Sequence, residues 1–185
     1  MIGVTQGSLG DYTSSLQSHQ RALEIRLARL GENHPDTAVS YDNIATLQRD
    51  LGDYISALPS HQRALKIKLE VLGENHPYTD CSYNNIGVTQ HRLGDYTSAL
   101  QSHQRALETW RERLGENHPD TAVSYNNIAT LPRDLGDYIL ALQSHQRALK
   151  SRLEVLGENH RDTASSYFSV GKVQFEVMGY SQVLK

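Results

Sequence analysis

The chain has 185 residues, the length of one domain or of a short array of repeats. Its 18 basic and 21 acidic residues give a formal net charge of −3 and are spread along the chain, so no surface for nucleic acid or an anionic membrane is predicted. The single cysteine, Cys81, excludes an intrachain disulfide framework, and no apolar run approaches the ~20 residues of a membrane-inserted helix. Because the N-terminus also lacks a signal-peptide pattern, the sequence predicts a soluble, intracellular protein of the cytoplasm.

A period of 42 residues runs along the whole chain. The motif GDY occurs four times at this spacing from Gly10 onward, and SHQRAL occurs four times from Ser18 onward. The block 31–72 differs from the block 115–156 at only six positions, which indicates that a two-repeat unit was duplicated. A fixed period of this length is typical of repeat architectures. The expected organisation is a single array over 1–185, with units of approximately 1–34 (partial), 35–76, 77–118, 119–160 and 161–185 (degenerate and partial).

Each repeat is expected to form two helices, as the second repeat illustrates. Pro35 suits a first helical turn, and Asp36 is favourable at the positive end of the helix dipole. Apolar residues then follow at helical spacing until Gly52 ends the first helix. Asp53 can cap the second helix, which Gly73 ends.

Stacked pairs of helices can share a continuous core that one pair alone cannot form. Small residues on both helices allow a close approach. The seam is expected between Tyr41, Ile44 and Ala45 of the first helix and Tyr54, Ala57 and Ala64 of the second.

This pattern resembles the tetratricopeptide repeat, whose helices carry W-x2-L-G-x2-Y and A-x3-F. Tyr41 stands for the Trp, Ile44 for the Leu and Ala45 for the Gly. Ala57 matches the first Ala of the second helix, and His61 replaces its Phe. The 42-residue period, the LG-x-x-HP loops and an Asn-Asn pair are similar to repeats of kinesin light chain and nephrocystin-like proteins. The resemblance implies an all-α fold, a right-handed superhelical α-solenoid of antiparallel helix pairs, in a non-catalytic scaffold or adaptor that binds proteins.

The histidines recur without a pattern that favours a metal site. One series lies on the second helices and the other in the loops: His19, His61, His103 and His145, and His34, His76, His118 and His160. Zinc needs three or four ligands converging at about 2.0–2.3 Å, whereas equivalent residues of stacked repeats are expected to lie apart. Packing, or a solvated loop position, is the favoured interpretation.

No catalytic arrangement is predicted either. The serine and histidine of SHQRAL are adjacent on a helix, so their side chains diverge by about 100° and cannot act as nucleophile and base. No glycine-rich phosphate loop is present. We therefore expect no metal, no cofactor and no enzymatic activity.

Asparagines in the middle of the first helices are the strongest candidates for binding. Asn is a moderate to poor helix former, so its recurrence needs a reason, and its carboxamide can pair with a peptide backbone. A hydrogen-bond ladder between repeats, or duplication alone, explains the recurrence equally well. The resemblance implies that the first helices line a concave groove. The predicted peptide groove comprises Asp42, Asn43, Thr46, Arg49, Asp50, Asn84, Asn85, Val88, His91, Arg92, Asn126, Asn127, Thr130, Arg133 and Asp134.

The charges of this predicted groove are mixed. Three arginines can pair with acidic side chains of a ligand, and Asp50 and Asp134 partly neutralise them. A strongly basic clamp for a C-terminal carboxylate is therefore not predicted.

Both ends of the array are irregular. The sequence is expected to begin part-way through a first helix and to stop a few residues into a second helix, GYSQVLK. In the last repeat Phe168 and Phe175 are predicted to be end contacts. They motivate an alternative function, that of an accessory subunit of a larger multiprotein assembly held through its ends and convex face.

Four single residues depart from the repeat pattern. Pro59 and Pro132 lie inside predicted helices, where each is either tolerated drift or a bend that tunes the curvature. Cys81 is expected to be a small, half-buried residue, and Trp110 a packing residue near a loop.

Overall fold

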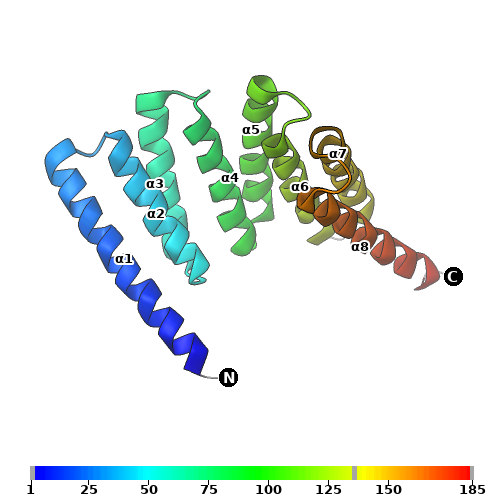
Figure 1. Ribbon diagram of the computed structural model, residues 1–185, viewed down its shortest axis with the longest axis horizontal. Coiled ribbons are helices and arrows are strands. Elements are labelled where there is room, and N and C mark those ends of the chain that lie inside the picture. The colour runs from blue at the N-terminus through cyan, green and yellow to red at the C-terminus, as the bar shows by residue number, and fades with distance from the viewer. Residues whose placement is uncertain (1–2, 135–136, 184–185) are drawn as a thin grey trace. The chain divides into compact units, whose positions relative to one another are not determined.

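The computed structural model describes residues 3–134 and 137–183, with side chains for 12–131, 133 and 137–178. This part of the chain is all-helical, which confirms the predicted fold class (Figure 1). The helices are α1 (Gly3–Leu30), α2 (Pro35–Asp50), α3 (Tyr54–Leu72), α4 (Pro77–Arg92), α5 (Tyr96–Leu114), α6 (Pro119–Asp134), α7 (Tyr138–Leu156) and α8 (Arg161–Val183). None of them is both long enough and apolar enough to cross a membrane.

Two compact units divide the chain, Met1–Asp95 with α1 to α4 and Tyr96–Lys185 with α5 to α8. In the first unit α2 packs against α1 and α3, and α3 packs against α4. In the second unit α6 packs against α5 and α7, and α7 packs against α8. Within each unit, a helix thus packs chiefly against its sequence neighbours, as in a solenoid. A single array over all 185 residues stays a prediction.

The loops between repeats are closed by side chains of the motif GENHPDT. His34 Nδ1 accepts a hydrogen bond from the backbone N–H of Asp36 at 3.1 Å and so caps α2. Thr37 donates to the carbonyl of Gly31 at 2.9 Å, and Gly31 has the positive φ of +84° that favours glycine. The same histidine cap recurs at His76, His118 and His160. These loop histidines lie at solvent-accessible positions, as predicted, and they also cap the helices that follow.

The core of each helix pair is built from small residues. Ala45, Ala57 and Ala64, three residues of the predicted seam, are fully buried. Ala64 forms a buried cluster with Ala38 and Ile67, against which Tyr41 packs. The fully buried imidazole of His61 takes the place of the aromatic ring that the family pattern has there.

Both ends differ from the sequence-based expectation. α1 runs without a break through Gly10 and Tyr12, where GDY was expected to separate two helices. α8 likewise continues past Gly179 to Val183, where a second helix was expected to begin. At Gly52 the same motif does make the turn, with φ +84°. The difference between these sites is packing. The turn at Gly52 joins α2 and α3, and the contact between these two long helices stabilises it.

The predictions for the four single residues that depart from the repeat pattern are confirmed only in part. Trp110 is buried, as predicted, whereas Cys81 is exposed and not half-buried. Pro59 lies inside α3 with an exposed side chain. The side chain of Pro132 lies outside the described residues.

Candidate functional site

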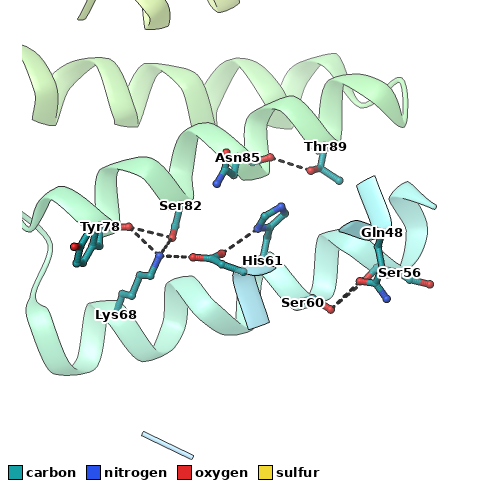
Figure 2. Close-up of polar contacts among 10 residues, drawn as sticks. Gln48, Ser56, Ser60, His61, Lys68, Tyr78, Ser82, Asn85 and Thr89 are labelled. Carbon is teal, nitrogen blue, oxygen red and sulfur yellow. Dashed lines mark hydrogen bonds and ion pairs between the residues drawn. The ribbon is translucent and has the colours of Figure 1, made fainter. Parts of the chain in front are cut away.

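In α2 the step Asp42–Asn43 is the counterpart of the Asn-Asn pairs, and its first residue is turned toward its own repeat. His61 Nδ1 donates to Asp42 Oδ1 at 3.0 Å, and the side chain of Asp42 is only 17% exposed. Lys68 pairs with the other carboxylate oxygen of Asp42. The Lys68 ammonium also donates to the carbonyl of Tyr78 at 3.1 Å and to Ser82 Oγ at 2.7 Å, as Figure 2 shows. Asp42 therefore serves the packing of α2, α3 and α4, although the sequence placed it in the peptide groove.

The equivalent contact in the second unit is neutral. His145 Nδ1 donates to Asn126 Oδ1 at 3.0 Å. Burial, with the nearby charges of Arg133 and Arg152, lowers the pKa of His145 to about 4. The imidazole is therefore uncharged at neutral pH. Asn126 thus has a partner within its own repeat, whereas a ladder between repeats was one of the interpretations left open.

Basic residues link second helices to the first helices that follow. Arg26 and Arg152 occupy the position of Lys68 one period earlier and two periods later. Arg26 donates to the carbonyl of Asp36 at 3.0 Å and to Ser40 Oγ at 2.8 Å. Arg152 donates in the same way to the carbonyl of Asp162 at 3.1 Å and to Ser166 Oγ at 2.6 Å. These links hold neighbouring repeats together.

A hollow in the first unit gathers several predicted groove residues. Its volume is about 510 Å³, within the usual range for ligand sites. α2, the start of α3, and α4 supply its lining: Arg49, Asp50, Tyr54, Asn84, Asn85, Val88 and Arg92. All of these except Tyr54 belong to the predicted groove, and Tyr54 had been placed in the core seam. We call this feature the α2–α4 hollow.

The chemistry of the α2–α4 hollow is mixed. On one side Arg49 lies beside Asp50, with its Nε 3.4 Å from Asp50 Oδ1. On the other side Arg92 is exposed at the end of α4. The carboxamide of Asn85 offers both donors and an acceptor, and Val88 adds an apolar wall. Such a surface can pair with a peptide backbone and attract an acidic side chain without forming a strongly basic clamp.

Other predicted groove residues lie outside this hollow. On α2, Asn43 is exposed and Thr46 is half-buried, and His91 is half-buried on α4. In the second unit the hydroxyl of Thr130 donates to the carbonyl of Asn127 at 2.7 Å. The side chain of Asp134 lies outside the described residues.

The second unit does not repeat the α2–α4 hollow in composition. Two periods further along, the residues of α4 that line it are replaced by Phe168, Ser169, Lys172 and Glu176. The carboxamides are lost, and the arginine becomes an acid. The combination of side chains in the first unit is therefore specific to that unit.

A second hollow was not predicted from the sequence. It has a volume of about 540 Å³ and lies among α5, α6 and α7, lined by Gln104, Leu107, Tyr125, Ile128, Leu140, Gln143, Ser144, Gln146, Arg147 and Lys150. None of these residues was a groove candidate. Beside it the hydroxyl of Tyr125 donates to Glu116 Oε1 at 2.5 Å, so part of its polar surface is already paired.

Metal chemistry has no geometric support among the described residues, where no group of three or more His, Cys, Asp or Glu side chains converges. The Ser-His steps of SHQRAL lie on helices, as expected: Ser60 donates to the carbonyl of Ser56 at 3.2 Å, while His61 is paired with Asp42.

Comparison with known proteins identifies the repeat. The sequence model of the tetratricopeptide repeat matches residues 2–70, 47–108, 78–150 and 121–178. No curated protein matches by sequence.

Several solved structures share the fold. BtubC (BKLC) from P. vanneervenii is 25% identical with a TM-score of 0.80, covering 94% of this chain and 69% of that chain. A putative kinesin light chain from Podosopora anserina with nearly identical TPR-like repeats is 16% identical with a TM-score of 0.79, covering 95% and 82%. The apo form of RapI is 20% identical with a TM-score of 0.78, covering 98% and 64%. With its 42-residue kinesin light chain-like repeats, the chain belongs to the tetratricopeptide repeat family.

Proposed function

We propose that this chain is a non-catalytic scaffold or adaptor that binds a peptide segment of a partner protein in the α2–α4 hollow. Tetratricopeptide repeats generally mediate protein–protein interactions. The observation that carries the proposal is the convergence of predicted groove residues from two first helices on one hollow of about 510 Å³. The larger hollow among α5, α6 and α7 contains none of them.

The lining suggests which kind of peptide fits. The carboxamide of Asn85 offers hydrogen-bond donors and an acceptor to the backbone of an extended peptide, as a neighbouring strand does in a sheet. Arg92 favours an acidic side chain on the α4 side of the hollow, and Asp50 disfavours one near α2. Val88 gives an apolar contact between them. The ligand class is an extended segment with an acidic residue next to an apolar one.

The test begins with peptides selected from a displayed random library by the intact chain. Binding of the selected peptides is then measured by fluorescence anisotropy for the intact chain and for Asn85→Ala/Arg92→Ala. Losing one backbone pair and one charge contact is expected to weaken binding about tenfold or more. Asn43→Ala, an exposed carboxamide outside the hollow, is the matched control and should bind normally.

The choice of variant follows from the geometry of the Asn pairs. Asn126 is not substituted, because its contact with His145 makes a loss of binding ambiguous with a loss of packing. Equal affinity of the intact chain and the double variant would show that the peptide binds elsewhere. Circular dichroism of both proteins establishes that the comparison is between folded chains.

A further inference from the structure

α1 exposes the face by which other second helices pack. Ile25 is 47% exposed, whereas Ile67, one period later on α3, is 1% exposed in a cluster with Ala38 of α2. His19 is half-buried, whereas its equivalent His61 is fully buried. α1 thus has the sequence of a second helix, including SHQRAL, but its seam with a first helix is open.

α8 exposes the opposite side of the same kind of seam, the face by which other first helices pack against second helices. Its residues Ala164, Phe168, Gly171 and Phe175 lie at i, i+4, i+7 and i+11, on one side of the helix. Three periods earlier these positions are Ala38, Asp42, Ala45 and Arg49 on α2, where both alanines are fully buried and Asp42 bonds His61 of α3. In α8 this first-helix face is open, with Phe168 75% and Phe175 79% exposed.

Neither end helix makes the turn that closes a helix pair within the chain. The glycines of the inner GDY turns have positive φ, +84° at Gly52 and +81° at Gly94. In α1, by contrast, Gly10 lies within a continuous 28-residue helix, and in α8 Gly179 lies within a 23-residue helix. Long helices that run straight past the turn position suit a pairing between two chains, because no connection has to reverse there.

We propose that α8 of one copy packs antiparallel against α1 of a second copy and so forms between chains the helix pair that the inner repeats form within one. The contacts between α2 and α3 give the register of this pairing. Ile25 then lies between Ala164 and Tyr167, which are the equivalents of Ala38 and Tyr41. Tyr167 is itself exposed before pairing.

Phe168 explains how this seam differs from the inner ones. It takes the place of Asp42, which contacts both His61 and Lys68. The equivalents on α1 are His19 and Arg26. An aromatic ring can pack on an imidazole and accept a guanidinium over its face, so Phe168 replaces an ion pair by aromatic and cation–π contacts.

A second copy of this chain is the occupant that the observations favour. The open face of α8 is that of a first helix, and the chain itself carries an open second helix whose sequence matches those already packed in this way. The two faces are different surfaces, so the contact is head-to-tail and each added copy leaves one face of each kind available. Assembly therefore continues beyond a dimer.

Sedimentation velocity over a series of protein concentrations tests the proposal. The intact chain should shift with increasing concentration from 20.8 kDa to multiples of that mass. Ile25→Asp and Phe175→Asp each block one face and should each remain monomeric alone. Mixed together they keep one complementary pair of open faces, so the mixture should give a dimer that grows no further.

Two controls keep the result interpretable. Ile139→Asp places the same charge at a 68% exposed position of α7 outside both faces and should assemble like the intact chain. Circular dichroism checks that each variant is folded, and Phe168→Lys replaces Phe175→Asp if the latter is not. An intact chain that stays monomeric throughout would overturn the proposal. So would either blocked variant forming dimers alone, which would indicate pairing of like faces, or a mixture that stays monomeric.

Discussion

At the scale of single residues, the links between repeats are buried polar contacts. Two of the six differences between the duplicated blocks are at positions that touch: Asp42 and Lys68 in one block are Asn126 and Arg152 in the other. The first block has a carboxylate, Asp42, that compensates the charge of Lys68, whereas the second block has the neutral Asn126 together with Arg152. Loss of a buried carboxylate beside a lysine is costly, whereas arginine spreads its charge over five donors and is less strongly hydrated. The two substitutions are therefore coupled through one contact.

The serine acceptors of these links give a matched pair of variants. Ser82→Ala removes an acceptor of the buried Lys68 ammonium and should cost about 1–2 kcal/mol of stability. Ser124 is the equivalent serine one period later, in the repeat where Trp110 replaces Lys68, and its buried hydroxyl has no hydrogen-bond partner among the described residues. Ser124→Ala should therefore be neutral or slightly stabilising. Urea unfolding of both variants measures the difference, and equal losses would contradict the assigned link.

His145 makes stability depend on pH. Its folded-state pKa of about 4 lies below the ordinary histidine value of 6.5, so the unfolded state binds the proton more tightly. The contribution of His145 to the free energy of unfolding should be fully present above pH 6.5. It should fall by up to about 3 kcal/mol as the pH drops from 6.5 toward 4. Urea unfolding across this range measures the slope. His145→Phe should flatten it, and an unchanged slope would assign the pH dependence to other groups.

At the scale of the helix, close packing of α2 and α3 depends on alanine. Ala57 is fully buried, so Ala57→Leu must push the two helices apart or force a strained rotamer. A loss of about 1–3 kcal/mol is expected in urea unfolding. Gln62→Leu on the exposed side of α3 is the control for helix propensity and hydrophobicity and should change stability little. A tolerated Ala57→Leu would mean that the seam is looser than its burial indicates.

Pro59 is a second, independent test of α3. It has no N–H to donate to the carbonyl of Ile55, and the equivalent positions are glutamine in α5 and α7. Pro59→Gln should raise the free energy of unfolding by about 1–3 kcal/mol, and Gln143→Pro should lower it by a similar amount. If peptide affinity also falls in Pro59→Gln, the proline shapes the α2–α4 hollow through Tyr54 on the same helix. Unchanged stability in both variants would mean that the helix tolerates proline at this position.

At the scale of the whole molecule, the period of 42 residues predicted the helices well because their ends carry local signals. Pro35, Asp53 and Gly73 are found at the first turn, N-cap and C-cap positions assigned to them. The histidine caps were missed because histidine is not among the usual N-cap residues. Only the geometry of the GENHP loop reveals that its ring reaches the backbone.

The site was predicted less completely, because the sequence does not fix which way adjacent side chains of a helix point. Adjacent helical residues point about 100° apart, so the sequence could place the Asp42–Asn43 step on a face but could not decide which member turns toward α3. Asp42 turns inward, where its carboxylate pairs with the buried side chains of His61 and Lys68. The straight ends were missed for a different reason. A GDY turn depends on a packed partner helix, which is tertiary information that the motif does not contain.

Hydrogen exchange should report the same contrast between inner and end helices. α3 packs against α2 and α4, and α7 packs against α6 and α8, whereas α1 packs chiefly against α2 and α8 chiefly against α7. At low protein concentration, amides of α1 and α8 should therefore exchange faster than those of α3 and α7. Mass spectrometry of peptides from each helix measures this order.

Repeating the hydrogen-exchange experiment at higher protein concentration tests whether α1 and α8 exchange quickly because their seams are open. If the end helices exchange quickly because their seams are open, pairing between copies should slow α1 and α8 together and leave α3 unchanged. In Ile25→Asp, which blocks the open face of α1, exchange should no longer depend on concentration. Protection that rises equally in all helices would instead indicate nonspecific association, and protection of α8 alone would indicate that α8 pairs with α8.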